Sequence, residues 1–187
     1  METPLQARQL FRLDNEVLAF RFTATVSDRA GEAPQERLSG PGRLKLWLHA
    51  VGLDVPDVSS AELEDALVLR EAIYRAGLAV AAARRPDPVD AAILNRVAAV
   101  GRSTSALDGN GLAVWKLGKG APVPDALGVL AADAIHVLGG ADRARIKACE
   151  GPGCAGLFLD GSRGANRRWC SMNTCGNRVK KARLAGK

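Results

Sequence analysis

Four stretches of the chain carry apolar residues at intervals of three and four, the spacing of one face of a helix. These stretches cover residues 41–51, 60–83, 88–100 and 124–138. Ser59 precedes Glu62 by three residues, a capping-box pattern that favours a helix start, and Asp87 before Pro88 favours another. A glycine pair beginning at Gly139 is typical of a helix end. The pattern therefore predicts four helices.

The third predicted helix has an apolar stripe that we expect to be buried. The stripe consists of Val89, Ile93, Val97 and Val100. Two tryptophans, Trp47 and Trp115, also fall on apolar faces of their segments. Because an indole ring gains most from being packed, we expect both rings to lie in the core.

Two segments outside the predicted helices have weaker patterns. Residues 14–26 contain apolar positions whose spacing fits a helix and a strand equally well. Within residues 103–119, a turn-forming cluster from Asp108 to Gly111 precedes a strand-like run from Leu112 to Leu117. We therefore predict an N-terminal domain that is mainly α with a small β-hairpin.

The composition is that of one packed domain with a small appended unit, in a chain of 187 residues. Aromatic residues make up only 4%, and Ala, Leu and Val dominate, as is typical of an aliphatic, helical core. No stretch reaches the length of a membrane span, and residues 1–16 lack the apolar region of a secretion signal. We therefore expect a cytoplasmic protein without membrane contact.

Charge and cysteine content divide the chain near Gly140. Residues 1–139 hold 15 lysines and arginines against 17 aspartates and glutamates, whereas residues 140–187 hold 11 against 3. All four cysteines lie in the basic segment, and disulfides rarely persist in the cytoplasm. We predict a helical domain over residues 1–140 and a cysteine module over residues 141–187.

The cysteines occur as two close pairs, a spacing that favours a metal site. They are Cys149, Cys154, Cys170 and Cys175, with four residues inside each pair and fifteen between the pairs. Two short turns that converge in this way give zinc its four tetrahedral sulfur ligands, leaving no open position for catalysis. An iron centre, a redox dithiol and unligated cysteines are the alternatives. We predict one structural Zn²⁺ ion.

The segments between the pairs predict a treble-clef-like module, a β-hairpin plus a helix. Residues 157–159 are expected to form one strand, residues 160–166 its turn, and residues 167–169 the return strand. Cys175 is followed by a helical run, so it is expected at a helix N-terminus, where backbone N–H groups favour a thiolate.

A broad basic surface surrounds the predicted metal site. Arg178 and Lys181 share one face of the last helix, so this helix is a candidate to enter a DNA groove. A solvated tail and neutralisation of the thiolates are the competing interpretations. The candidate DNA-binding residues are Arg163, Arg167, Arg168, Asn177, Arg178, Lys180, Lys181 and Arg183.

These residues resemble a known family. The runs that carry the resemblance are Phe158-Leu159-Asp160, Arg167-Arg168-Trp169-Cys170-Ser171-Met172 and Cys175-Gly176-Asn177-Arg178. They are similar to the bacterial CGNR zinc-finger family, in which the finger follows a helical domain called ABATE. The resemblance implies a stress-related transcription regulator with zinc on the four cysteines, and it implies DNA binding.

The N-terminal resemblance is looser and has one departure. It rests on Glu36-Arg37-Leu38, on Leu44 to Leu48 and on the helix through Tyr74. The family usually has Phe-x-Asn-Thr near its start, whereas this chain reads Phe22-Thr23-Ala24-Thr25. Ala24 thus replaces the asparagine amide, which puts the function of that region in question.

Together these patterns predict a DNA-binding regulator rather than an enzyme. No acid, base or nucleophile arrangement is visible at a recognisable spacing, and the predicted metal shell is full. The helical domain is expected to sense a small-molecule ligand or to form a homodimer, while the zinc module contacts DNA. The alternative is an adaptor whose basic finger docks an acidic protein partner.

Overall fold

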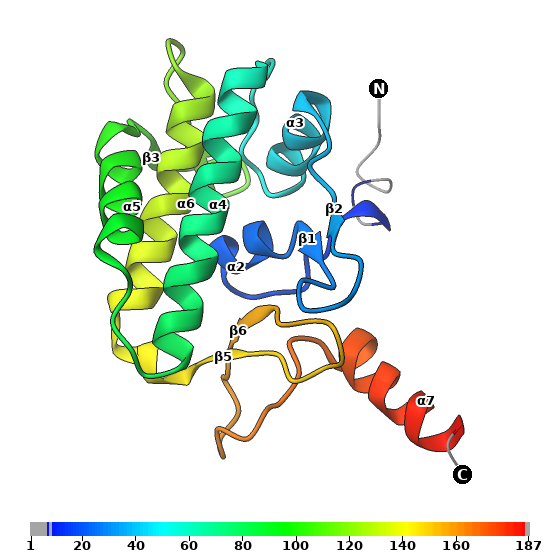
Figure 1. The fold of residues 1–187 in the computed structure, drawn as a ribbon. Coiled ribbons are helices and arrows are strands. Elements are labelled where there is room, and N and C mark those ends of the chain that lie inside the picture. The colour runs from blue at the N-terminus through cyan, green and yellow to red at the C-terminus, as the bar shows by residue number, and fades with distance from the viewer. Residues whose placement is uncertain (1–6, 8, 186–187) are drawn as a thin grey trace.

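Three packed helices, α4, α5 and α6, form the body of the molecule (Figure 1). The computed structural model describes residue 7 and residues 9–185. All four predicted helices are present: α3 (Pro41–Ala50), α4 (Ser60–Ala81), α5 (Pro88–Val100) and α6 (Pro122–Gly139). None of the helices in the described ranges is both long and apolar enough to cross a membrane.

The helix starts follow the predicted capping chemistry. The Ser59 hydroxyl accepts a hydrogen bond from the Glu62 N–H, and the Glu62 carboxylate accepts one from the Ser59 N–H. The Asp87 carboxylate accepts the Val89 N–H ahead of α5. Each contact satisfies a backbone donor that has no partner inside the helix, which fixes where the helix begins.

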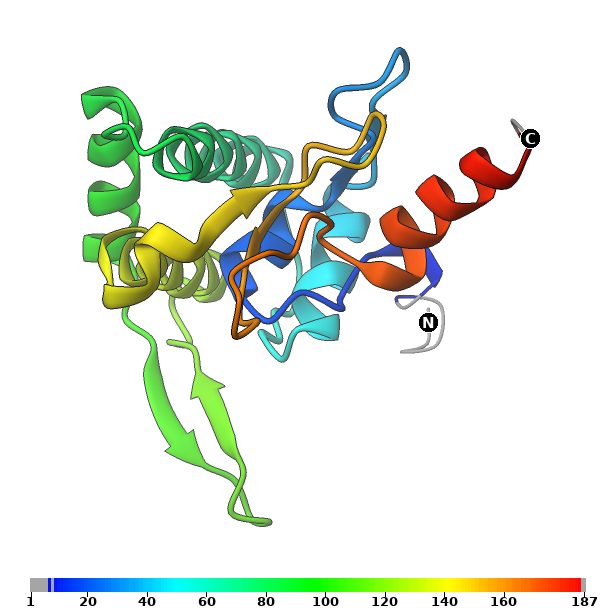
Figure 2. The ribbon, with the colours of Figure 1, turned by 90° about the horizontal axis from the view of Figure 1, so that it is seen from below.

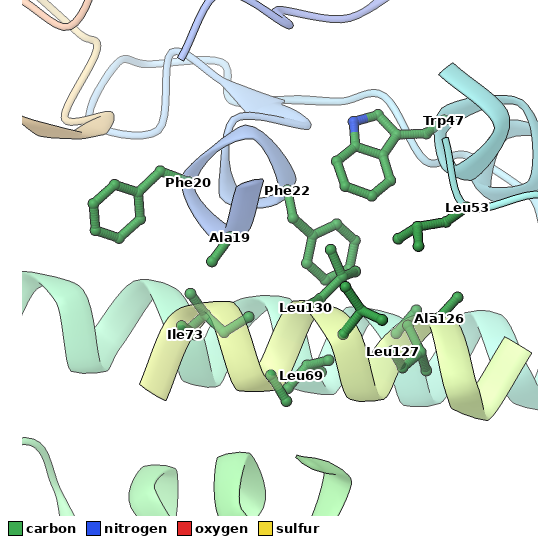
Figure 3. Packing of buried hydrophobic residues seen from close by; sticks show 14 of the residues in the cluster. Ala19, Phe20, Phe22, Trp47, Leu53, Leu69, Ile73, Ala126, Leu127 and Leu130 are labelled. Carbon is green, nitrogen blue, oxygen red and sulfur yellow. The ribbon is translucent and has the colours of Figure 1, made fainter. Parts of the chain in front are cut away.

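The ambiguous segment before these helices forms both kinds of structure. Residues of α2 (Leu18–Thr23) are helical, and β1 (Val26–Ser27) then pairs antiparallel with β2 (Gln35–Glu36). Short helix α2 places Phe20 and Phe22 against α4 and α6, and the Phe22 ring lies 5.0 Å from the Trp47 ring, centroid to centroid (Figure 3). Trp47 is fully buried, as predicted.

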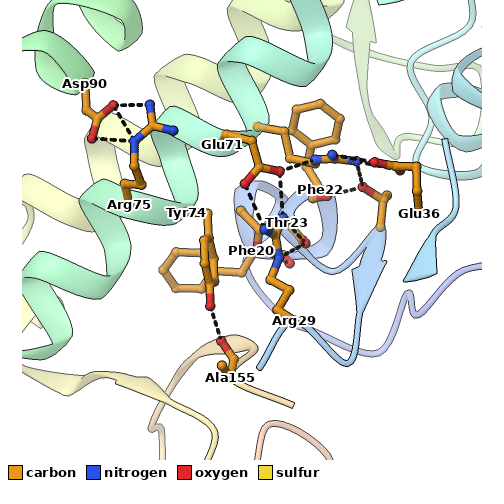
Figure 4. A network of polar contacts seen from close by, with 12 residues as sticks. Phe20, Phe22, Thr23, Arg29, Glu36, Glu71, Tyr74, Arg75, Asp90 and Ala155 are labelled. Carbon is orange, nitrogen blue, oxygen red and sulfur yellow. Dashed lines mark hydrogen bonds and ion pairs between the residues drawn. The ribbon is translucent and has the colours of Figure 1, made fainter. Parts of the chain in front are cut away.

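Helix α5 buries only part of the predicted stripe, because Ile93 and Val97 pack against the core whereas the two end residues do not. Val89 and Val100 are 67% and 59% exposed, whereas Asp90 and Leu94 are buried. The helical period was read correctly, but the buried stripe is rotated by one residue. Asp90 can be buried because both its carboxylate oxygens accept hydrogen bonds from Arg75 of α4 (Figure 4). A charged residue therefore lies on the buried face of α5, where the apolar pattern did not predict one.

The predicted hairpin is present, but it does not contribute its tryptophan to the core. Strand β3 (Thr104–Leu107) pairs antiparallel with β4 (Ala113–Lys116), and the hairpin projects away from the body as an arm (Figure 2). The Asp108 carboxylate accepts the N–H groups of Asn110 and Leu112 and so holds the turn. Trp115 is 42% exposed, because the arm extends beyond the helices that could cover it.

A chain of ion pairs ties α4 to the β1–β2 region (Figure 4). Arg70 is almost completely buried, and its guanidinium donates to both carboxylate oxygens of Glu36 and to the Thr25 hydroxyl. Glu71 accepts two hydrogen bonds from Arg29 and one from Arg70. The two buried guanidinium groups are thus fully paired, which is the condition for burying charge without a large penalty.

Replacing Glu71 with glutamine is expected to lower stability by about 1 kcal/mol at neutral pH, since Glu71 is partly solvated. Burial acts to raise the pKa of Glu71, but the hydrogen bonds and charge of Arg29 outweigh it and leave the pKa below its ordinary value. The stabilisation is therefore present above the ordinary glutamate pKa and disappears as pH falls through the lowered one.

Thermal unfolding from pH 7 downward measures this effect. The gap in Tm between the native chain and Glu71→Gln should shrink as pH falls below about 4. Glu64→Gln, an exposed substitution on the same helix, serves as the control and should leave Tm nearly unchanged at every pH. A gap that stays constant with pH would show that the charge of Glu71 does not stabilise the fold.

The C-terminal part contains a hairpin that differs from the predicted one. After η1 (Ala141–Arg145), β5 (Ile146–Ala148) pairs antiparallel with β6 (Leu157–Leu159), and η2 (Met172–Gly176) leads into α7 (Asn177–Ala185). Strand β6 was predicted correctly, but residues 167–169 form no strand. The Arg167 N–H instead donates to the Asp160 carboxylate. A side chain, rather than the backbone of a neighbouring strand, therefore holds this segment in place.

Candidate metal centre

The first cysteine pair lies in the turn of the β5–β6 hairpin. Cys149 follows β5 directly, and its N–H donates to the Gly156 carbonyl, which closes the turn around Cys154. Gly153 has a φ of 73°, a conformation that favours glycine. A Cβ at Gly151 would lie 2.9 Å from the Cys175 Cβ, so only glycine lets the two cysteine-bearing turns approach this closely.

The second pair spans the turn that starts the last helix. Cys170 precedes η2, a π-type turn, and Cys175 lies within it, two residues before α7 begins. The Gly176 N–H donates to the Ser171 carbonyl and so closes this turn. Cys175 therefore lies close to the N-terminus of α7, as predicted from the helical run that follows it.

The four sulfur atoms meet in one place. All four ligand atoms lie within 4.8 Å of one another, and all four cysteines are buried and free of disulfides. The Cys170 Sγ lies 3.6 Å from the Cys154 Sγ and 3.8 Å from the Cys175 Sγ. A tetrahedral zinc ion with bonds of about 2.3 Å separates its sulfur ligands by about 3.8 Å. The geometry therefore fits one zinc ion.

The sulfur atoms also affect one another's pKa values. Hydrogen bonding with Cys149 and the other thiols lowers the pKa of Cys154. Hydrogen bonding with Cys149 raises the pKa values of Cys170 and Cys175. Sulfurs this close cannot all be negative without strong mutual repulsion. A divalent cation among them removes that repulsion, which is why the cluster favours a metal over four free thiols.

Donors from the surrounding chain point at the sulfurs. The N–H groups of Gly151 and Cys170 donate to the Cys149 Sγ at 3.4 and 3.3 Å. Arg12, near the other end of the chain, donates from Nη2 to the Cys170 Sγ at 3.3 Å. These donors offset the negative charge that four thiolates give a zinc site. Nothing in the spacing of the sequence pointed to Arg12, which lies 158 positions from Cys170.

Asp160 organises the loop between the cysteine pairs, a role that the sequence did not reveal. It is fully buried, and its carboxylate accepts from Lys147 Nζ at 2.7 Å, from the Ser162 hydroxyl and from the Arg167 N–H. The contact with Lys147, followed by that with Ser162, lowers the pKa of Asp160. The apolar cluster around Phe158 is small, so it cannot order this loop by itself. The hydrogen bonds to the Asp160 carboxylate hold the loop in its conformation.

Three arginines among the predicted DNA-binding residues contact other parts of the protein. Arg167 donates to the carbonyl groups of Trp169 and Cys170 and stacks over the Phe158 ring. Arg168 pairs with Glu150 on the surface. These arginines thus help to hold the module together.

The third of these arginines, Arg178, connects the module to the rest of the chain. Its Nη1 lies 2.7 Å from the Asp28 carboxylate and also donates to the Pro152 carbonyl. Asn177 is exposed, with its side chain donating to the Asn173 carbonyl. The other four candidates are exposed and have no ion pair within residues 9–185: Arg163, Lys180, Lys181 and Arg183.

The module packs firmly against the helical part. Ile146 and Leu157 belong to the main apolar core, and a Cβ at Gly77 of α4 would lie 2.3 Å from the Leu157 side chain. The Tyr74 hydroxyl donates to the Ala155 carbonyl, and the Asn15 amide donates to the Leu157 carbonyl. The metal site is therefore attached to α4 and to the N-terminal segment by both apolar and polar contacts.

Ala24, which replaces the family asparagine, lies at the end of α2. Its N–H donates to the Phe20 carbonyl, and the hydroxyls on either side, of Thr23 and Thr25, donate to carbonyls of the same helix. Thr25 also accepts from Arg70 of the ion-pair chain. The position thus borders the buried polar network.

The fold and the cysteine cluster define a class, a helical domain that carries a four-cysteine zinc-finger module. Residues 145–186 match the CGNR zinc finger family. Residues 16–141 match the ABATE family, whose description is "Putative stress-induced transcription regulator". The chain belongs to the ABATE family, and its clustered cysteines form a site able to bind one zinc ion. A search of curated proteins finds no match to the chain.

Proposed function

We propose that this protein is a transcription regulator that binds DNA through the exposed basic face of α7. The observation that carries the proposal is the exposure of Lys180, Lys181 and Arg183. These side chains are exposed and form no ion pair within the described ranges, on a helix that projects from the body (Figure 1). Unpaired cations on a projecting helix are suited to contact phosphates.

Arg178 has a different role in this proposal from the one its sequence position indicated. Its ion pair with Asp28 holds the first turn of α7 against the loop after β1. A residue paired in this way fixes the direction in which the helix projects. We therefore assign phosphate contact to the later turns of α7 and to Arg163, and a positioning role to Arg178.

The helical part is proposed as the sensing part of the regulator. Contacts from Arg12, Tyr74 and Asp28 reach the zinc module from three different segments, which supports coupling between the two parts. The division at residue 140, a small-molecule ligand and a cytoplasmic location belong to this proposal as well. Both matched families are of regulator and zinc-finger type, which is consistent with a non-enzymatic role.

Replacing Lys180 and Lys181 together with alanine is expected to weaken DNA binding roughly tenfold to a hundredfold at about 0.1 M salt. Each lost phosphate contact also makes the decline of affinity with salt shallower, so the slope of log affinity against log salt should fall by about 2. Fluorescence anisotropy with a mixed pool of duplex DNA, at several salt concentrations, measures both quantities.

The control removes two other exposed cations, Arg84 and Arg85, which follow α4 far from α7 in the sequence. This variant has the same net charge as the Lys180 and Lys181 variant but should bind DNA like the native chain. Zinc content should be equal in all three proteins. An equal loss of affinity in both variants would contradict the proposal. Capture of an acidic protein without any DNA binding would also contradict it and would favour the adaptor function.

A further inference from the structure

Helix α7 has very little apolar packing of its own. No side chain of residues 177–184 belongs to either apolar cluster, and Val179 is the only one of them that is even partly buried. The helix has nine residues, a length at which an isolated helix is marginal in water. Its direction relative to the body must therefore be set by contacts at its first turn (Figure 1).

One ion pair joins the first turn of α7 to the helical part. Arg178 Nη1 lies 2.7 Å from the Asp28 carboxylate, and the two side chains are 44% and 34% exposed. In the described part of the chain, it is the only side-chain hydrogen bond or ion pair between α7 and the residues before 141. A solvated pair of this kind contributes little free energy, so small changes in its surroundings are enough to open it.

Asp28 belongs to a turn that also contacts the first cysteine turn. The Asp28 carbonyl accepts the Gly31 N–H at 2.9 Å, and Asp28 has a φ of 52°, in the left-handed region. The Ala30 N–H donates to the Gly153 carbonyl at 3.0 Å. A Cβ at Gly153 would lie 3.4 Å from the Gly31 Cα, so the two backbones touch. The turn of residues 28–31 thus contacts both the first cysteine turn and α7.

The same turn is connected to the ion-pair chain on α4. Arg29, the residue after Asp28, donates to both carboxylate oxygens of Glu71. The Arg29 Cζ lies 4.0 Å from the centre of the Tyr74 ring, and the Tyr74 hydroxyl donates to the Ala155 carbonyl (Figure 4). Because Arg29 is bonded to Asp28 through the backbone, a displacement of α4 moves the partner of Arg29 and shifts the turn with it.

We propose that the turn of residues 28–31 is the element through which the helical part controls the direction of α7. While Asp28 and Arg178 are paired, α7 is held in one orientation against the body. When the pair opens, α7 is attached through the zinc module alone and samples many orientations. This regulation deepens the DNA-binding function proposed above and rests on it for its purpose, but the control of α7 can be measured without DNA.

Residual dipolar couplings of the full, zinc-loaded chain test the proposal, because they report the average orientation of each N–H bond. An exposed ion pair favours its closed form by up to about fivefold, so in the native chain the couplings of residues 179–184 should agree with the orientation of α4 and α6. In Asp28→Asn these couplings should fall by roughly half. Asparagine tolerates the left-handed backbone at this position, so the variant removes the charge and keeps the turn.

Two further variants complete the test. Asp57→Asn is the matched control, because it also removes one carboxylate from an exposed ion pair, with Lys45 on the body, and it should leave the couplings of α7 unchanged. Glu71→Gln removes the charged partner of Arg29 without changing Asp28, and it should lower the couplings of α7 as well. The double variant should lower them no further than Asp28→Asn alone, since both changes act on one contact. Zinc content and the couplings of α6 should be native in every variant.

Two results would overturn the proposal. The first is a set of α7 couplings that is equal in the native chain and in Asp28→Asn, because the pair would then not hold the helix. The second is a native set of α7 couplings in Glu71→Gln, because α4 would then have no influence on α7. No DNA is present in these measurements, so a failure to bind DNA would remove the proposed function and leave the result for α7 as it stands.

Discussion

Replacing Cys170 with alanine is expected to abolish stable zinc binding and to unfold residues 149–176, while the helices of the body stay folded. Three thiolates cannot complete a tetrahedral sulfur shell, and the Cys170 Sγ lies 3.6 Å from the Cys154 Sγ, 3.8 Å from the Cys175 Sγ and 3.3 Å from Arg12 Nη2. Metal binding contributes on the order of 10 kcal/mol to the folding of so small a module. The apolar cluster around Phe158 cannot compensate for this loss.

Two measurements check this expectation. Elemental analysis should show about one zinc per native chain and almost none in Cys170→Ala. Limited proteolysis should then cut the variant between residues 149 and 176 and leave the native module intact. Thr174→Ala, an exposed substitution between the same two cysteines, is the control and should keep both its zinc and its resistance to protease.

A variant that loses zinc but remains resistant to protease would show that contacts such as those of Asp160 and Lys147 hold the module without metal. A variant that keeps its zinc at native affinity would show that Cys170 is not a ligand. Either result would overturn the assignment of a structural zinc site, so the experiment separates the metal from the protein contacts around it.

The local sequence predicted those features that depend on local chemistry. The starts of α4 and α5 are set by Ser59 and Asp87, which each satisfy a backbone donor within three residues. The cysteine cluster was predictable for a related reason. Within each pair only four residues separate the cysteines, so a short turn is enough to bring Cys149 close to Cys154 and Cys170 close to Cys175. Only the contact between the two turns depends on the rest of the fold.

Features that depend on distant residues could not be predicted in this way. The buried face of α5 is set by Arg75, which neutralises Asp90 from a different helix. Strand β6 pairs with the three residues of β5, a run too short to show a strand pattern. The ion pair of Arg178 with Asp28 could not be foreseen either, because the two residues lie 150 positions apart in the chain. In each case one long-range contact decides the outcome.

Replacing Gly128 with alanine is expected to destabilise the protein by about 1–3 kcal/mol, because α5 and α6 touch at this residue. A Cβ at Gly128 would lie 2.6 Å from the Gly101 Cα and 3.2 Å from the Gly101 nitrogen. Those are backbone atoms, so no side-chain rotation can relieve the overlap. The two helices must move apart, which disturbs the packing of Leu94 and Leu127.

Thermal unfolding measures the effect, with an expected fall in Tm of roughly 3–10 °C for a chain of this size. Gly139→Ala is the matched control, since Gly139 belongs to the same helix and a Cβ there would have no neighbour within 4 Å. Alanine has a higher helix propensity than glycine, so Gly139→Ala should be neutral or slightly stabilising. If Gly128→Ala behaved like Gly139→Ala, the contact between α5 and α6 would not need a glycine. The rotated face of α5 would then have to be explained by Asp90 alone.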